Sequence, residues 1–375
     1  MNFDIREAQP KVWELLLKII DHNKVGSAYL FAGPSGVGKE AMAIEFGAVI
    51  NSQYFKSDAK VSVDNYNKFK NLQHELLKLV FPLPASSTKK DNGSPLDSLK
   101  ESDLQLLNEL IGKKVSEPFQ KLILPGATRI LISSIRELRK KLYLKSDDVG
   151  RKIVVIFDAH LLSAGQAESA NALLKILEEP PQNTTIILVT DSKEQLLPTI
   201  LSRCQHIDFP PLNNSTIKHF LLEQGINGDF IDIVVELAGG DMRNAISIAR
   251  KSVADLIKTV NELSEVILDE NGNEWRKFIE DNAKLIRTDK NQFQFNLFLL
   301  QNWFKSVHHL RLGMPNEFHH PQLLDKMKQF NKEYPNANLG LINVLIEEAI
   351  ESVGKNLYMS LTLTNLLVNI RKQLI

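Results

Sequence analysis

The residues best suited to chemistry form a phosphate-binding loop near the start of the chain. The loop follows the pattern G-x-x-x-x-G-K-[ST] at every position but the last: Gly33-Pro34-Ser35-Gly36-Val37-Gly38-Lys39-Glu40. In such a loop, backbone N–H groups converge on the phosphates and the lysine neutralises the β- and γ-phosphates. The pattern therefore predicts a site for ATP or ADP that is formed by Gly33, Gly36, Gly38, Lys39 and Glu40.

The last position of the loop departs from the pattern in a way that affects metal binding. A Ser or Thr hydroxyl there binds Mg²⁺, whereas Glu40 places a carboxylate beside the β-phosphate oxygens. Because the position of Mg²⁺ decides much of phosphoryl-transfer catalysis, we expect ATP hydrolysis by this chain to be weak or absent. Whether the loop binds nucleotide or keeps only its shape stays open, and no metal site is predicted.

One carboxylate follows a second apolar run. Asp158 comes directly after residues 152–157 and is the only acidic residue at that point. It could hold Mg²⁺ and orient water, or it could cap the helix that follows. His160, two residues further on, fits a surface or packing histidine better than a catalytic one.

Two arginines are candidates for phosphate contacts. Arg203 lies just before the predicted edge of the first domain, where it is either a solvated residue or an arginine finger offered to a neighbouring subunit. Arg243 begins a later helix and could reach a phosphate of its own chain or pair with Asp241. Cys204 is read as a small buried apolar residue and not as a nucleophile.

These candidates need a parallel sheet to bring them together. Near-continuous apolar runs at Ala28–Ala32, 152–157 and 185–190 predict strands that are covered on both faces. Helical periodicity at 12–20 and 167–177 alternates with them. The pattern predicts an α/β P-loop core, with a parallel sheet and helices on both faces.

The chain is predicted to have three domains. Residues 1–211 form the α/β core, in which 51–125 reads as an irregular insertion with one possible strand at 76–83. Residues 212–255 read as short helices, and residues 256–375 as an all-α domain with long helical periodicities at 293–310 and 341–353.

Composition places the chain among ordinary globular proteins. The 45 Lys and Arg residues balance the 45 Asp and Glu residues, so the whole chain carries no charge signal for nucleic acid or membranes. The single cysteine excludes a disulfide within the chain and a multi-cysteine zinc site, which fits a reducing cytoplasm. No apolar run approaches the roughly 18 residues that span a bilayer.

Taken together, these motifs resemble the bacterial DNA polymerase III clamp-loader subunits of the AAA+ class. Two stretches are highly specific to that family: Asn171-Ala172-Leu173-Leu174-Lys175-Ile176-Leu177-Glu178-Glu179-Pro180-Pro181 and Leu197-Pro198-Thr199-Ile200-Leu201-Ser202-Arg203-Cys204. The stretch Ser27-Ala28-Tyr29-Leu30-Phe31-Ala32-Gly33-Pro34 also resembles the family's entry into the phosphate loop. The resemblance covers residues 10–250, with a long irregular gap at 51–125. The resemblance implies that residues 212–255 form the AAA+ lid domain and that residues 256–375 form the collar domain through which the ring assembles.

Two branches of this family compete, the ATP-hydrolysing gamma/tau subunit and the delta-prime subunit with its often degenerate site. Glu40 favours delta-prime, as does Phe157, which falls where the active subunit has its Mg²⁺ aspartate; Asp158 falls at the position of the catalytic glutamate. The stretch 132–138 is also similar to delta-prime sequences. The alternative is a gamma/tau-like subunit with its own ATPase. The zinc-binding cysteines of both branches are absent, so no zinc is expected.

The resemblance also assigns roles and partners. Arg203 would be the finger that completes a gamma/tau neighbour's ATP site, Arg243 the second-domain sensor, and Thr190 the sensor after the third predicted strand. The partners implied are gamma/tau and delta subunits in a hetero-pentameric ring, with the sliding clamp and primer–template DNA reached through that complex. A cytoplasmic location and no membrane partner are expected.

Overall fold

The computed structural model describes residues 4–374 except 56, 85–93, 145–148, 227–230, 251–252, 270–272, 289, 315–320 and 354–357. The chain divides into two compact units: the first comprises Met1–Phe220 and Gly240–Arg243, and the second Leu221–Gly239 and Asn244–Ile375. Each unit is described by itself. The division into three domains at 211 and 255 stays a prediction.

The first unit is built on one five-stranded sheet in which every paired strand is parallel. In spatial order its strands are β2 (Leu77–Val80), β3 (Lys152–Ile156), β4 (Thr184–Thr190), β1 (Ala28–Ala32) and β5 (Gln205–Asp208). All five residues of β1 and all seven of β4 are buried, as the apolar runs predicted. The predicted α/β class with a parallel sheet is confirmed.

The strand β5 was not predicted from the sequence. It lies at the edge of the sheet, pairs only with β1, and buries a single side chain, that of Ile207. An edge strand with one buried side chain has no apolar run by which to recognise it.

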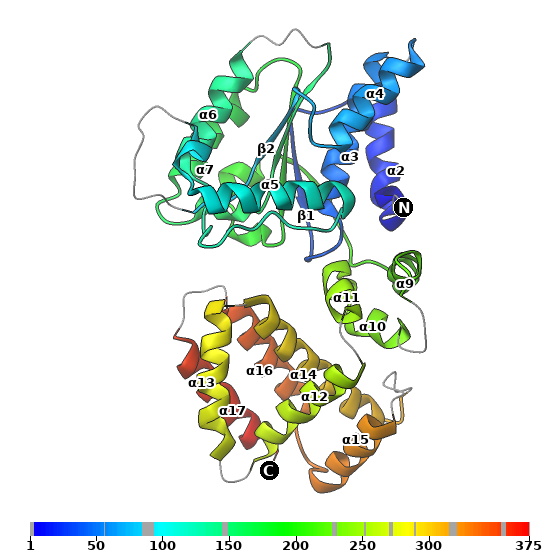
Figure 1. The fold of residues 1–375 in the computed structure, drawn as a ribbon, viewed down its shortest axis with the longest axis vertical. Coiled ribbons are helices and arrows are strands. Elements are labelled where there is room, and N and C mark those ends of the chain that lie inside the picture. Colours follow the sequence, from blue (N-terminus) through cyan, green and yellow to red (C-terminus); the bar gives the residue numbers. More distant parts are fainter. Residues whose placement is uncertain are drawn as a thin grey trace. The chain divides into compact units, whose positions relative to one another are not determined.

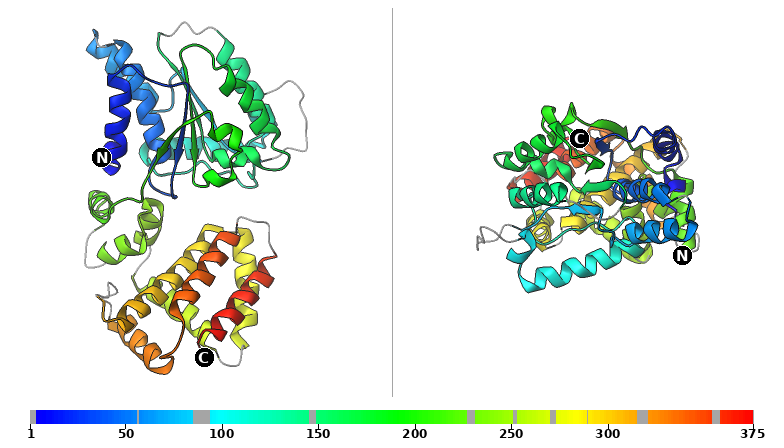
Figure 2. Two further views of the ribbon diagram at one scale, coloured as in Figure 1. Left: turned by 180° about the vertical axis from the view of Figure 1, so that it is seen from behind. Right: turned by 90° about the horizontal axis from the view of Figure 1, so that it is seen from above.

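Helices cover both faces of the sheet (Figures 1 and 2). On one face α3 (Lys39–Ser52) contacts β1, β3 and β4, with α2 (Pro10–Asp21) and α4 (Ala59–Lys70) outside it. On the other face α6 (Ile132–Tyr143) and α7 (Glu168–Glu178) share an apolar core with the strands. The remaining elements of this unit are α1 (Ile5–Ala8), η1 (Gln53–Phe55), η2 (Pro95–Ser98), α5 (Glu101–Ser116), η3 (Ala159–Ser163), η4 (Lys193–Gln195) and α8 (Pro198–Leu201).

The segment 51–125 is more regular than expected, apart from residues 85–93, which lie outside the described residues. It holds α4, β2 and the 16-residue helix α5. The helix α5 was not recognised from the sequence because it is mostly polar and so has no clear apolar periodicity. Its two buried residues are Leu107 and Lys114. The possible strand at 76–83 is confirmed, although β2 is shorter.

A buried carboxylate holds α4 against the core. Glu45 on α3, whose side chain is 1% exposed, accepts hydrogen bonds from Arg6 Nε (2.8 Å), Tyr66 Oη (3.0 Å) and Lys70 Nζ (2.7 Å). In addition, His74 Nε2 lies 2.7 Å from Asn65 Oδ1, which joins the connection between α4 and β2 to α4. Ion pairs and hydrogen bonds thus link α1, α3 and α4 here.

The second unit is helical throughout its described secondary structure, as predicted for the C-terminal part of the chain. The long helix α14 (Lys290–Arg311) contacts α12, α13, α15 and α16, and its Trp303 and Phe304 pack edge-to-face with Phe330 of α15. The helices assigned wholly or mainly to this unit are α10 (Ile231–Leu237), α11 (Met242–Ala249), α12 (Val253–Leu268), α13 (Asn273–Thr288), α15 (Pro321–Glu333), α16 (Leu339–Ser352) and α17 (Met359–Lys372), while most of α9 (Asn214–Glu223) belongs to the first. Across the described parts of the chain, no helix combines the length and apolar character needed to cross a membrane.

Candidate nucleotide-binding site

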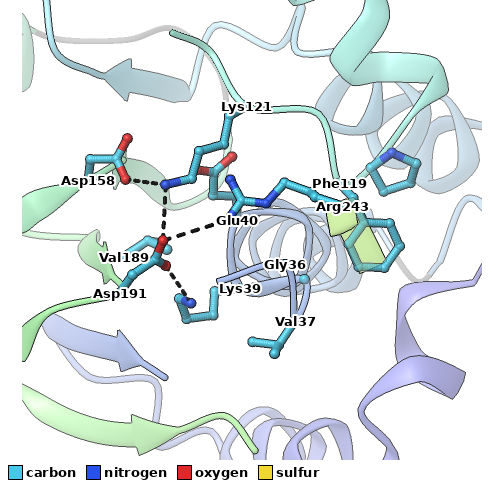
Figure 3. A pocket seen from close by; sticks show the side chains of 12 residues that line it. Gly36, Val37, Lys39, Glu40, Phe119, Lys121, Asp158, Val189, Asp191 and Arg243 are labelled. Atoms are coloured by element: carbon cyan, nitrogen blue, oxygen red, sulfur yellow. Dashed lines mark hydrogen bonds and ion pairs between the residues drawn. The ribbon is translucent and has the colours of Figure 1, made fainter. Parts of the chain in front are cut away.

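The site lies where the carboxyl ends of three neighbouring parallel strands meet. The phosphate-binding loop connects β1 to α3, Asp158 follows β3, and Asp191 follows β4. Because these strands run in the same direction, their following residues gather at one edge of the sheet, which is where α/β proteins bind ligands. Figure 3 shows Lys39, Asp158 and Asp191 pointing into this one pocket.

The glycines of the loop adopt backbone conformations that other residues rarely adopt. Gly36 has φ 66° and Gly38, the N-cap of α3, has φ 89°. A Cβ atom on Gly36 would lie 1.6 Å from Oδ1 of Asp241, so that a side chain at this position would collide with it. The loop therefore has the tight path that a phosphate loop requires.

Lys39 is engaged within the protein itself. Its side chain is 4% exposed, and its Nζ lies 2.7 Å from Asp191 Oδ1 and 2.7 Å from the carbonyl oxygen of Gly33. It also donates to the carbonyl oxygen of Pro34. Burial lowers the pKa of Lys39, and the Asp191 carboxylate opposes that shift. A carboxylate thus holds the ammonium group that the motif assigns to phosphates.

A second lysine lies between the two carboxylates. Lys121 Nζ is 2.6 Å from Asp158 Oδ1 and 3.1 Å from Asp191 Oδ2 (Figure 3). Burial alone would lower the pKa of Lys121, but Asp158 and Asp191 raise it above its ordinary value. Burial alone would likewise raise the pKa of Asp191, but Lys121, Lys39 and Arg243 hold it well below its ordinary value. Lys121 and Asp191 thus favour each other's charged form.

Glu40, the residue that departs from the loop pattern, is paired with a lysine. Glu40 Oε2 forms an ion pair with Lys114 Nζ, which also donates to the Gln120 carbonyl oxygen at 2.6 Å. The same ammonium group lies 5.1 Å from the ring centre of Phe157. The two departures from the active pattern, Glu40 and Phe157, therefore both contact Lys114.

Arg243 joins the pocket from the start of α11. Its guanidinium donates to Ser35 Oγ and lies 3.7 Å from Asp191 Oδ2. Its backbone N–H donates to Asp241 Oδ1 at 2.8 Å. Arg243 therefore pairs with Asp241 and lines the pocket, and its contact with a phosphate stays a prediction.

The pocket is small and its charges are paired. Its cavity has a volume of about 30 Å³, whereas ligand sites usually measure about 300–1,000 Å³. The cations Lys39, Lys121 and Arg243 fit a polyphosphate. The donor set does not fit Mg²⁺, since Glu40, Asp158 and Asp191 are each paired with a lysine. The lining residues are Gly36, Val37, Gly38, Lys39, Glu40, Pro118, Phe119, Lys121, Asp158, Val189, Asp191 and Arg243.

The other predicted site residues lie beside or away from this pocket. Thr190 is buried, and its Oγ1 accepts a hydrogen bond from the Ser192 N–H at 3.0 Å and contacts His160 Nδ1 at 3.1 Å. Burial lowers the pKa of His160, in keeping with a packing histidine. Arg203 follows α8 at the surface, where it pairs with Glu178 at 2.8 Å.

Three residues of the site were missed from the sequence. Asp191 could have been recognised as a site residue, because it is a carboxylate directly after a predicted strand. Lys114 and Lys121 could not have been recognised, because they belong to the segment that was read as irregular. Asp158 occupies the N-cap position of η3 as anticipated, but its side chain pairs with Lys121 and makes no capping hydrogen bond.

Fold and site together define a P-loop α/β protein with a helical C-terminal unit. The model of the family described as DNA polymerase III, delta subunit, matches residues 8–213, more than half of the 375-residue chain. The chain therefore belongs to this family. The resemblance to the bacterial DNA polymerase III clamp-loader subunits is confirmed.

Individual relatives include both branches that the sequence suggested. The DNA polymerase III subunit delta' of Bacillus subtilis is 26% identical over 327 residues, which cover 87% of this chain and 85% of that protein. The subunit tau of Bacillus subtilis is 25% identical over 70% of this chain but only 40% of its own length. A gamma-subunit-related protein of Thermotoga maritima, solved by crystallography, is 18% identical, with a TM-score of 0.41 and coverage of 96% and 99% of the two chains.

Proposed function

We propose that this chain is the delta-prime-type subunit of a DNA polymerase III clamp loader, with a degenerate nucleotide site and an arginine finger given in trans. The internal pairing of the phosphate site supports this most directly. Asp191 pairs with Lys39, and Lys114 pairs with Glu40, so the residues that would bind phosphate and metal are each already paired within the protein. The similarity to Bacillus subtilis delta' over 87% of this chain points the same way.

In this proposal the chain assembles with gamma/tau and delta subunits into a hetero-pentameric ring in the cytoplasm. The ring places the sliding clamp on primer–template DNA. Residues 256–375 serve as the collar domain and residues 212–255 as the lid. Arg203, exposed beside Glu178, stabilises charge that develops on the γ-phosphate in a gamma/tau neighbour, as arginine fingers do.

The test is ATP hydrolysis by a reconstituted clamp loader. We expect Arg203→Ala to leave assembly intact and to lower turnover about 10³-fold at the one affected ATP site. Lys18→Ala, which removes an exposed charge of α2 paired with Glu14, is the matched control and should change neither property. Unchanged ATPase in the complex that contains Arg203→Ala would refute the finger role.

The second candidate is a gamma/tau-like subunit with its own ATPase. The intact run from Gly33 to Lys39 and the position of Arg243 in the pocket favour it. The purified chain separates the two candidates. ATP turnover with Mg²⁺ that Lys39→Ala abolishes would establish this second candidate, and no turnover is expected under the first.

A further inference from the structure

Two ammonium groups enter the phosphate site from one stretch of chain, α5 and the residues after it. The Lys114 side chain is 1% exposed and that of Lys121 is 17% exposed. Burying a charged lysine is unfavourable unless the charge is paired and hydrogen-bonded. Both are paired with carboxylates of the site, so their positions are set by the site itself.

Lys121 lies where carboxylate oxygens from two neighbouring strands converge. Asp158 follows β3 and Asp191 follows β4, and one ammonium group contacts both, at 2.6 and 3.1 Å. Carboxylate oxygens are the ligands that Mg²⁺ prefers. Here an ammonium group with three N–H donors satisfies them instead.

Lys114 accounts for the two unusual residues of the site together. It pairs with Glu40, which stands where the motif has a metal-binding hydroxyl, and it lies over the ring of Phe157 at 5.1 Å. A cation is attracted by both a carboxylate and an aromatic face. Glu40 and Phe157 therefore form an environment suited to a lysine and unsuited to Mg²⁺.

Asp191 forms the ion pairs with the cations of the site that a bound phosphate group would form. Its carboxylate is shared among three cations: Lys39 at 2.7 Å, Lys121 at 3.1 Å and Arg243 at 3.7 Å (Figure 3). All three approach the N-terminus of α3, where the helix dipole favours negative charge. A bound polyphosphate would compete with this carboxylate for the same three groups.

We propose that Lys114 and Lys121 take the place of the divalent cation in this site, and that the site accepts the free polyphosphate of a nucleoside di- or triphosphate, without Mg²⁺, in exchange for Asp191. This rests on the proposed function only in treating the site as one without efficient hydrolysis. Lys121 makes the site prefer the metal-free nucleotide. Asp191 competes with the nucleotide's phosphates for the same cations and so weakens nucleotide binding.

The experiment is a titration of the purified full chain with a fluorescent N-methylanthraniloyl ATP, once in EDTA and once in excess MgCl₂. We expect the wild-type chain to bind no more tightly with Mg²⁺ than in EDTA. Asp191→Asn should bind about tenfold more tightly in EDTA, because Lys39, Lys121 and Arg243 lose their competing carboxylate. Lys121→Met should bind about tenfold more weakly in EDTA and recover with Mg²⁺, since Asp158 and Asp191 can then take a metal.

The controls separate charge from folding. Lys113→Met removes an exposed lysine of α5, the neighbour of Lys114, that pairs with Glu109, and it should bind like the wild-type chain. Lys121→Arg keeps the positive charge and should keep the metal-free preference. Circular dichroism melts show which variants are folded.

Three results would overturn the proposal: about tenfold tighter wild-type binding with Mg²⁺, no gain in Asp191→Asn, or no binding in EDTA by any folded variant. The titration uses the isolated chain and the proposed function is tested in the reconstituted ring. Failure of one is therefore distinguishable from failure of the other.

Discussion

The Nζ of Lys70 lies 2.7 Å from Oε2 of Glu45, and this contact joins α4 to the helix that begins at the phosphate-binding loop. Glu45 is 1% exposed and is also bonded to Arg6 and Tyr66. One buried carboxylate therefore fixes three separate elements around the first unit's core. The same helix carries Lys39 and Glu40, so the ion pairs and hydrogen bonds of Glu45 also help to hold these two site residues in position.

Replacing Glu45 with alanine should destabilise the chain by about 2–3 kcal/mol, because Arg6 and Lys70 are left without their buried partner. The Arg6 and Lys70 side chains are about one-third exposed, so the loss of stability is smaller than for a fully buried ion pair. Urea unfolding measures the change. Glu109→Ala breaks an exposed pair with Lys113 and should cost less than about 1 kcal/mol. Equal losses in the two variants would contradict the structural role given to Glu45.

The stability that Asp191 contributes should depend on acid pH. The pKa of this carboxyl is lowered in the folded chain, so its contribution is present above the ordinary pKa of about 3.9 and is lost as the pH falls toward the folded-state value. The advantage of the wild-type chain over Asp191→Asn should therefore shrink below about pH 4, by up to about 1.4 kcal/mol per pH unit. Urea unfolding of both proteins at stepped pH measures this. A constant difference would show that Asp191 is not held by Lys39 and Lys121.

Gly36→Ala should destabilise the first unit, whereas Gly112→Ala should not. At Gly36 the backbone has φ 66°, and a Cβ would lie 1.6 Å from Asp241 Oδ1, so we expect a loss of about 1–3 kcal/mol. At Gly112 in α5 the added Cβ meets no atom within 4 Å beyond the adjoining backbone of its own helix, and a stabilisation of up to about 1 kcal/mol is expected. Thermal unfolding compares the two. A stabilised Gly36→Ala would mean that the loop does not need its left-handed backbone.

The parts of the fold that could be predicted are those with local signals. The strands β1, β3 and β4 are recognisable because nearly every side chain in them is buried, which produces unbroken apolar runs. The strand β5 buries one side chain and gives no such run. The helix α5 was missed for a related reason, since most of its surface is polar and exposed.

The site divides in the same way. The loop from Gly33 to Lys39 is local, and its function follows from its spacing. The pairing of Glu40 with Lys114 joins residues 74 positions apart, and that of Lys121 with Asp191 joins residues 70 apart. No periodicity or spacing rule reaches across such distances. The sequence therefore shows that the metal-binding hydroxyl of the motif is absent, but it does not show that Lys114 and Lys121 lie in the site.

Cys204 should react slowly with thiol reagents in the folded chain. Burial raises the pKa of its thiol to about 11 from an ordinary value of about 9, and the thiolate is the reactive form. Near pH 8 the thiolate population is then about 100-fold lower than for an ordinary thiol, and labelling with a maleimide should slow in proportion. Because the chain has one cysteine, the labelling rate reports this residue alone. The same chain unfolded in guanidinium is the matched control. Equal rates in the two states would show that the thiol is not shielded where Cys204 packs against the core next to Leu201.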